Sequence, residues 1–300
     1  MLLERPLTDN LELIAKQVVE GFIIGLHKSP FHGFSVEFAE HRLYNPGDAL
    51  RHIDWRVYGR TDKLFIKRFE EETNLRCCLV LDTSSSMQFP QDEKKLSKLQ
   101  FACVAAASLL QLLKRQLDAS ALALFDEKVY YTSQCRSAHS HYRMLTNELQ
   151  KTLNYQAANK KTNAAAALHQ IAEQMHKRSL IVIFSDMMDD SENIEELFNA
   201  LQHLKYNKHE VVLFHLADGK QEIDFEFENR PYEFIDMETN EHVKLQPQHI
   251  KNQYVEQMHQ FREMITNRCH QYQIDRVAVD LNEPVEKVLY SFLLKRNNMV

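Results

Sequence analysis

Residues 79 to 87 read Leu79-Val80-Leu81-Asp82-Thr83-Ser84-Ser85-Ser86-Met87, and the fold prediction starts from them. An apolar run ends in the carboxylate of Asp82, and hydroxyls follow at Ser84 and Ser86. The pattern predicts a buried strand with oxygen ligands in the loop beyond it, where a hard divalent cation could bind. Such a metal would either help to cut a substrate or help to grip a partner.

Strand-like and helix-like patterns alternate from residue 75 to the C-terminus. Short apolar runs predict strands, and apolar residues three and four apart predict helices. The expected strands are 75–81, 120–125, 128–132, 180–184, 211–216 and 274–279, and the expected helices are 94–117, 139–153, 163–177, 192–205, 247–272 and one opened by Pro284. This alternation predicts an α/β, Rossmann-like fold: a mostly parallel six-stranded sheet with helices on both faces. Residues 232–245 are expected to form a separate hairpin.

The N-terminal part has a different character. A helix is expected from Asp9 to about Leu26, because Asp9 can cap it and apolar residues recur on one face. Residues 31–70 mix aromatic and charged residues, and 63–69 alternate as a half-exposed strand does. We therefore expect residues 1–73 to form an N-terminal helix with an extended or β region, and residues 74–300 to form the α/β domain.

Composition limits the class of protein. The apolar fraction of 44% and the charged fraction of 26% are those of a folded globular domain. The formal charge of −6, without a cluster of Lys and Arg, argues against a nucleic-acid partner. No run of about 18 apolar residues occurs, so we expect no membrane span. Five cysteines without the spacing of a zinc site or a disulfide framework, and an N-terminus unlike a secretory signal, favour the cytoplasm.

Three segments are expected to deliver oxygens to one edge of the sheet. They are Asp82 with Ser84 and Ser86, then Thr162 at the start of a helix, and then Asp186 directly after the strand ending at Phe184. Ligands of open α/β sheets bind beyond the carboxyl ends of the strands. Each residue taken singly could be a turn or capping residue. Together they predict a metal site, completed to the six ligands of Mg²⁺ by water or a partner's carboxylate.

The same residues resemble the metal-ion-dependent adhesion site of von Willebrand factor A domains. The segment before them contains Glu37-Phe38, Arg42-x-Tyr44-x-x-Gly47-Asp48, Arg51-x-Ile53-Asp54-Trp55-Arg56 and Lys67-x-Phe69, and Phe234-x-Asp236-x-Glu238-Thr239 comes later in the chain. These motifs resemble the bacterial domain-of-unknown-function family numbered 58, whose members carry a von Willebrand-type domain. One departure is the family's Asp-Pro-x-Glu after the fifth strand, which here reads Asp218-Gly219-Lys220-Gln221-Glu222.

The resemblance implies a protein-binding module. In such domains Mg²⁺, with Mn²⁺ or Ca²⁺ as substitutes, keeps one open coordination position that a partner's Asp or Glu fills. Ser84, Ser86 and Thr162 would bind the ion, and Asp82 and Asp186 would contact it directly or through water. The resemblance also implies association with a MoxR-type AAA+ ATPase and a role in the assembly or maturation of protein complexes.

An enzyme would need a base or nucleophile at the same place. A phosphatase of the haloacid dehalogenase type needs a second carboxylate two residues after the strand-end Asp, where this chain has Ser84. Neither a Gly-x-Ser-x-Gly elbow nor a phosphate-binding glycine loop occurs in the sequence. We therefore expect a non-catalytic protein, with a Mg²⁺-dependent hydrolase built on Asp82 as the alternative. For Asp54-Trp55 the sequence leaves a partner surface and a structural role both open.

Overall fold

The computed structural model describes residues 10–23, 37–44, 53, 55–70, 75–92, 95–154, 163–188, 194–237 and 239–297. Its contacts divide the chain into two compact units. The larger unit contains Met1–Phe31 and Arg76–Val300, and the smaller unit is His32–Leu75. The sequence-based division into 1–73 and 74–300 differs from this one, because the N-terminal helix groups with the larger unit.

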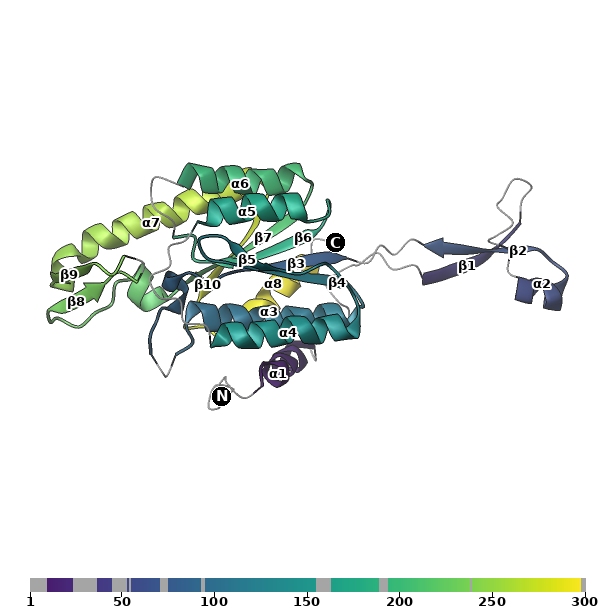
Figure 1. Cartoon of the computed structure of the whole chain (residues 1–300), viewed down its shortest axis with the longest axis horizontal. Coiled ribbons are helices and arrows are strands. Elements are labelled where there is room, and N and C mark those ends of the chain that lie inside the picture. Colours follow the sequence, from purple (N-terminus) through teal and green to yellow (C-terminus); the bar gives the residue numbers. More distant parts are fainter. Residues whose placement is uncertain are drawn as a thin grey trace. The chain divides into compact units, whose positions relative to one another are not determined.

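A six-stranded sheet forms the centre of the larger unit (Figure 1). Its strands are β3 (Arg76–Asp82), β4 (Ala119–Phe125), β5 (Val129–Thr132), β6 (Leu180–Ser185), β7 (Glu210–Ala217) and β10 (Asp275–Asp280), and their order is β10-β7-β6-β3-β4-β5. The strands pair in parallel except β5, which pairs antiparallel with β4. The predicted mostly parallel six-stranded sheet is confirmed.

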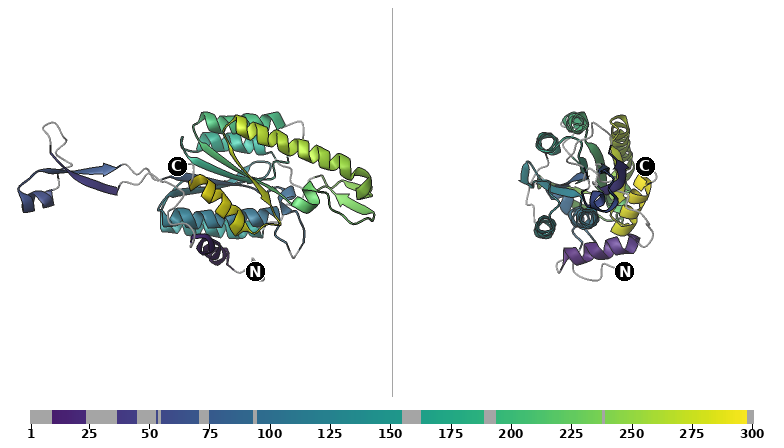
Figure 2. Two further views of the ribbon diagram at one scale, coloured as in Figure 1. Left: turned by 180° about the vertical axis from the view of Figure 1, so that it is seen from behind. Right: turned by 90° about the vertical axis from the view of Figure 1, so that its right-hand side faces the viewer.

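Helices cover both faces of this sheet (Figures 1 and 2). One face carries α3 (Lys98–Arg115), α4 (His139–Leu153) and α8 (Val285–Asn297), with α1 (Leu11–Ile23) packed on α3. The other face carries α5 (Ala164–Gln174), α6 (Ile194–Tyr206) and α7 (Pro247–Gln271). Because both faces are covered, all residues of β6 are buried. This is why the central strands are continuous apolar runs.

The start of α3 is set by a capping box. The Ser97 side chain accepts a hydrogen bond from the Gln100 N–H, and the Gln100 side chain accepts one from the Ser97 N–H. This reciprocal pair satisfies two amides that the first helical turn leaves free. The helix therefore begins at Lys98, later than the position 94 expected from apolar spacing.

Two small elements follow β7 at the carboxyl edge. A single π-helical turn, η3 (Gly219–Ile223), was not expected from the sequence. The hairpin of β8 (Tyr232–Ile235) and β9 (His242–Leu245) was expected, and the two strands pair antiparallel. Phe234 of this hairpin forms ring contacts with Phe225, stacked, and with Phe227, edge-on, and these two rings also meet edge-on.

The smaller unit contains an antiparallel ribbon of β1 (Glu37–Leu43) and β2 (Phe65–Glu70). The predicted strand at 63–69 is confirmed by β2. A short helix, α2 (Trp55–Thr61), lies where the sequence suggested extended chain. Trp55 is 63% exposed there and meets Tyr58 edge-on.

None of the described helices combines the length and the apolar character that crossing a membrane requires.

Candidate metal centre

The candidate site lies where the strand order reverses. From β3 the chain moves to β4 on one side, and it then returns to place β6 and β7 on the other side of β3. In open α/β sheets this reversal creates a crevice beyond the strand ends. Asp82 ends β3 and Asp186 directly follows β6, so the two carboxylates flank the reversal. The sequence predicted both residues but could not predict that their strands are neighbours.

An aspartate stands at the end of each of the five parallel strands. Asp82 and Asp280 are the last residues of β3 and β10, and Asp126, Asp186 and Asp218 directly follow β4, β6 and β7. The side chains of Asp82, Asp186 and Asp218 are fully buried. In the sequence each of these aspartates ends or follows an apolar run, but only Asp82 and Asp186 were predicted to be metal ligands.

Asp82 is held by donors from the loop after β3 and from the end of β6. Its Oδ1 accepts a hydrogen bond from the Ser84 N–H at 3.0 Å, and its Oδ2 accepts one from the Ser185 hydroxyl at 2.7 Å. Burial, followed by the negative charge of Asp186, raises the pKa of Asp82 to about 7. No described Lys or Arg forms an ion pair with Asp82, so this carboxylate lacks the counter-charge that would favour its ionised form.

Ser84 and Ser86 present their hydroxyls to each other, with 3.1 Å between the two Oγ atoms. Ser84 precedes the short 3₁₀ helix η2 (Ser85–Gln88), but its side chain forms no capping hydrogen bond. The Ser84 side chain therefore does not cap η2, although the residue occupies the N-cap position. Ser84 is buried and Ser86 is half-buried, so the hydroxyl pair reaches from the strand end toward solvent.

Asp186 is the second carboxylate of the site. Its Oδ2 lies 2.7 Å from the Lys98 Nζ, and its Oδ1 accepts a hydrogen bond from the Met188 N–H at 3.2 Å. Burial opposes ionisation, but the charge and hydrogen bond of Lys98, with a hydrogen bond from the Ser86 side chain, lower the pKa of Asp186. The Ser86 contact joins Asp186 to the loop after β3. Four of the five predicted ligands, Asp82, Ser84, Ser86 and Asp186, are thus brought together.

Thr162, the fifth predicted ligand, lies outside the described residues. Its neighbour Asn163 caps α5 by accepting a hydrogen bond from the Ala166 N–H. The Asn163 N–H donates to the carbonyl of Asp126 at 3.2 Å. The start of α5 therefore lies at the end of β4, next to the strand that carries Asp82.

Sequence reasoning missed Lys98 and Glu222. Lys98 is fully buried, and its Nζ lies 2.6 Å from the Glu222 Oε1 as well as 2.7 Å from Asp186. The helix dipole disfavours cations in the first turn of a helix, but the helix start expected at residue 94 placed Lys98 beyond that turn. Such a lysine needs acidic partners from elsewhere in the fold.

His215 supports the same strand end from the interior of β7. Its Nδ1 accepts hydrogen bonds from the Arg276 guanidinium, so its Nε2 carries the proton and donates to the Asp186 carbonyl at 3.0 Å. Burial, with the charge of Arg276, lowers the pKa of His215 to about 3. The imidazole is therefore neutral around pH 7.

The spacing of the donor oxygens fits Mg²⁺. Two neighbouring ligands of an octahedral Mg²⁺ lie about 3 Å apart, since each bond is about 2.1 Å long. The 3.1 Å between the hydroxyls of Ser84 and Ser86 matches this spacing. The described residues contain no cluster of three or more His, Cys, Asp or Glu side chains that could hold a metal ion. An ion here would therefore depend on the hydroxyls beside the two carboxylates, and these residues fit a hard cation.

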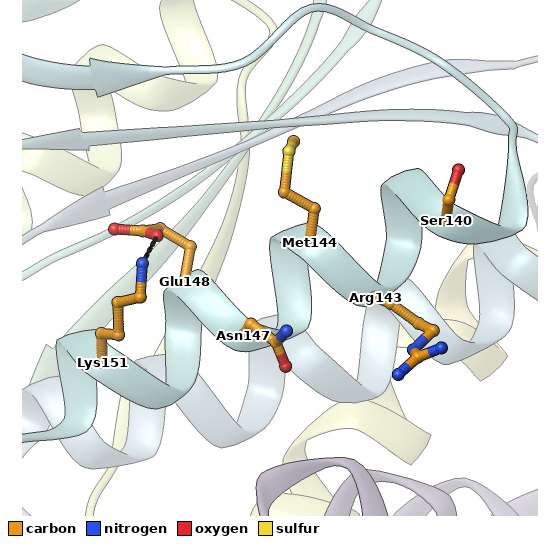
Figure 3. Close-up of a pocket in the computed structure, with 6 residues that line it drawn as sticks. All are labelled: Ser140, Arg143, Met144, Asn147, Glu148 and Lys151. Atoms are coloured by element: carbon orange, nitrogen blue, oxygen red, sulfur yellow. Dashed lines mark hydrogen bonds and ion pairs between the residues drawn. The ribbon is translucent and has the colours of Figure 1, made fainter.

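Two surface hollows lie away from these residues. One, of about 380 Å³, is lined along α4 by Ser140, Arg143, Met144, Asn147, Glu148 and Lys151 (Figure 3). All six side chains come from one helix, and Glu148 and Lys151 pair with each other. The other, of about 660 Å³, lies along α7 beside Asp224. Neither hollow contains a residue of the candidate metal centre.

Comparisons with known proteins identify relatives. The model of the family described as "Protein of unknown function DUF58" matches residues 40–264. The uncharacterized proteins Mb1516 of Mycobacterium bovis and Rv1480 of Mycobacterium tuberculosis are each 26% identical over 178 residues, which is 59% of this chain and 55% of the relative. The chain thus spans about half the length of the curated relatives it matches.

Solved structures were found at lower identity. BatB, a conserved hypothetical protein from Bacteroides thetaiotaomicron, is 12% identical with a TM-score of 0.44, and the match covers 75% of this chain and 100% of that chain. An aerotolerance-related membrane protein from Bacteroides fragilis, with multiple mutations to serines, is 14% identical with a TM-score of 0.48. That match covers 76% of this chain and 100% of that chain.

Proposed function

This chain belongs to the family described as protein of unknown function DUF58, and on that premise we propose that it is a non-catalytic, metal-dependent protein-binding module. Its metal centre is of the von Willebrand A adhesion type. The observation that carries the proposal is the pair of buried strand-end carboxylates, Asp82 and Asp186, beside the two facing hydroxyls of Ser84 and Ser86.

In this proposal Ser84, Ser86 and Thr162 hold Mg²⁺, while Asp82 and Asp186 contact it directly or through water. The bound ion supplies an open coordination position for an Asp or Glu of the partner. Asp82 and Asp186 would balance the charge of the ion, and a cation bound there would favour the ionised form of Asp82, whose pKa is raised by burial and by the charge of Asp186. Half-exposed Ser86 lies on the side from which a partner can approach.

The surroundings of Asp82 favour binding of a protein partner over hydrolysis of a substrate. Both of its oxygens are occupied, one by a backbone amide and one by the Ser185 hydroxyl, and the side chain has no exposed surface. These two donors leave each oxygen a lone pair for an ion, whereas a nucleophilic carboxylate must also be reachable by the substrate, which a fully buried side chain is not. Residue 84, where an acid/base carboxylate would stand, has a hydroxyl directed at Ser86.

The companion protein follows from the family resemblance. We propose a MoxR-type AAA+ ATPase as the partner or assembly companion, and the assembly or maturation of a protein complex as the role. All five cysteines are free, which suits the reducing cytoplasm that we propose as the location.

Calorimetry on the purified full chain tests the metal. We expect one Mn²⁺ or Mg²⁺ to bind per chain, and Ser84→Ala/Ser86→Ala to weaken binding at least tenfold. Ser140→Ala, on the surface of α4, is the matched control and should bind as wild type does. Equal heats for wild type and the double variant would remove the metal centre.

Two further measurements distinguish a protein-binding module from a hydrolase. With a purified MoxR-type ATPase, complex formation should require Mg²⁺, and EDTA or Asp82→Ala should abolish it. The same preparations should not turn over phosphoesters. If metal-dependent hydrolysis is observed and Asp82→Ala abolishes it, the proposed binding module is wrong and the protein is a hydrolase.

A further inference from the structure

Lys98 has surroundings unlike those of an ordinary helix lysine. It is the first residue of α3, its side chain is 1% exposed, and its Nζ lies 5.8 Å from the centre of the Phe89 ring. Burying an ammonium group is costly unless acidic partners surround it. The first turn of α3 contains no acidic residue, so the compensating charges come from two distant segments.

Those charges are Asp186, after β6, and Glu222, in η3. The Lys98 Nζ lies 2.7 Å from the Asp186 Oδ2 and 2.6 Å from the Glu222 Oε1. The other oxygen of Glu222, Oε2, accepts a hydrogen bond from the Asp218 N–H at 2.8 Å. One ammonium group therefore joins the end of β6 to the turn that follows β7.

We propose that Lys98 is a positioning residue of the metal centre, which holds the Asp186 carboxylate toward the ion and links it through Glu222 to the η3 segment. The part of this inference that concerns the ion rests on the function proposed above. With Oδ2 held by Lys98 and Oδ1 by the Met188 N–H, the carboxylate of Asp186 is fixed at both oxygens. The Ser86 hydroxyl then meets a carboxylate whose orientation is already set.

Without Lys98, Asp186 and Glu222 would be two anions facing the same buried space. They would repel each other, and each would move toward other donors or toward water. The displacement would take Asp186 away from Ser86 and loosen η3 at the same time. A lysine that only filled space would not couple these two segments.

Lys95 provides a matched control. It lies in the same segment as Lys98, and its Nζ pairs with a buried strand-end aspartate, the Oδ2 of Asp218, at 3.3 Å. Asp218 follows β7 and lies outside the proposed ligand set. Lys95→Met therefore removes a longer ion pair, made by a lysine whose side chain is 36% exposed, without touching Asp186.

Hydrogen exchange on the full chain without metal provides the first readout. Lys98→Met should speed exchange of the Met188 and Asp218 amides at least tenfold, relative to the buried Leu122 amide of β4, which donates to the Ser133 hydroxyl. Lys95→Met should leave the Met188 amide unchanged. Unchanged exchange at Met188 in Lys98→Met would overturn the inference, and so would equal acceleration there in both variants.

Metal affinity provides the second readout. Lys98→Met should weaken Mn²⁺ binding at least tenfold, Lys95→Met less than threefold, and Lys98→Arg should fall between wild type and Lys98→Met, because a guanidinium keeps the charge but changes its position. Tighter binding by Lys98→Met would show that Lys98 competes with the ion and would overturn the inference.

Two further outcomes are distinguishable. If wild type binds no Mn²⁺, the proposed function fails, and the exchange at Met188 still decides whether Lys98 fixes Asp186. If Lys98→Met does not fold, Lys98→Arg decides. Wild-type exchange at Met188 together with wild-type Mn²⁺ affinity in that variant would overturn the inference.

Discussion

The Ser185 hydroxyl donates a hydrogen bond to Asp82 across 2.7 Å and thereby joins the ends of the two central strands, β6 and β3. The same Oγ accepts the Met187 N–H at 2.9 Å. Ser185 and Asp82 are both fully buried. A buried carboxylate that pairs with no Lys or Arg among the described residues is thus stabilised by a neutral donor from the neighbouring strand.

Removing this hydroxyl should destabilise the protein. Ser185→Ala leaves Asp82 and the Met187 N–H each short of a partner, and an unsatisfied buried group costs about 1–3 kcal/mol. Urea unfolding should show this loss. The control is Ser108→Ala, because Ser108 is equally buried but its hydroxyl only bonds the Val104 carbonyl of its own helix. That change should be nearly neutral. Equal effects of the two substitutions would contradict the importance of the link.

Metal affinity should depend on pH through Asp82. Burial raises the pKa of Asp82 to about 7, so below that pH the metal-free carboxyl is protonated and cannot serve as an anionic ligand. Mn²⁺ affinity should fall up to about tenfold per unit below pH 7 and level off above it. Calorimetry in two buffers of different protonation enthalpy should detect proton release near pH 7. Affinity that stays constant from about pH 6 to pH 8 would contradict the role of Asp82.

Stability should fall in acid through His215. Its pKa is lowered to about 3, whereas an unfolded chain has a histidine pKa near 6.5, so between these values the unfolded state binds more protons. Stability therefore rises with pH across that window and is lost as pH falls through it. His215→Gln should reduce the slope by up to about 1.4 kcal/mol per pH unit. Urea unfolding at several pH values measures this, and parallel pH profiles of wild type and variant would contradict it.

A methyl group at Gly219 should disturb η3. A Cβ there would lie 2.5 Å from the Asp280 Oδ2 and 2.8 Å from its Cγ. Asp280 cannot simply move aside, because its Oδ1 accepts the Gly219 and Asn282 N–H groups. Gly219→Ala should cost about 1–3 kcal/mol.

Gly59 serves as the control for that substitution. A Cβ at Gly59 meets nothing within 4 Å, and the residue lies inside α2. Gly59→Ala should therefore be neutral or slightly stabilising. Thermal unfolding measures both variants. A Gly219→Ala protein as stable as Gly59→Ala would contradict the close approach of η3 to the end of β10.

Local sequence patterns were enough to predict most helices and strands of the sheet domain. The apolar run before Asp82 predicted β3, and the alternation of runs and helical spacings predicted the parallel sheet, because a strand buried on both faces must be apolar throughout. The spacing of Asp82, Ser84 and Ser86 likewise identified the oxygen-rich loop. Helix α2 was missed, since Trp55 to Thr61 lacks the apolar face that marks a buried helix.

By itself the amino-acid sequence determined which residues end the strands and which oxygen atoms stand there, because strand ends and turn residues are encoded locally. Only the tertiary structure decided that β3 and β6 are neighbours, which brings Asp82 beside Asp186. It also decided that Lys98 meets Asp186 and Glu222, which lie 88 and 124 positions further along the chain. Charge pairs between segments so far apart depend on how the strands are ordered, and no local pattern records that order.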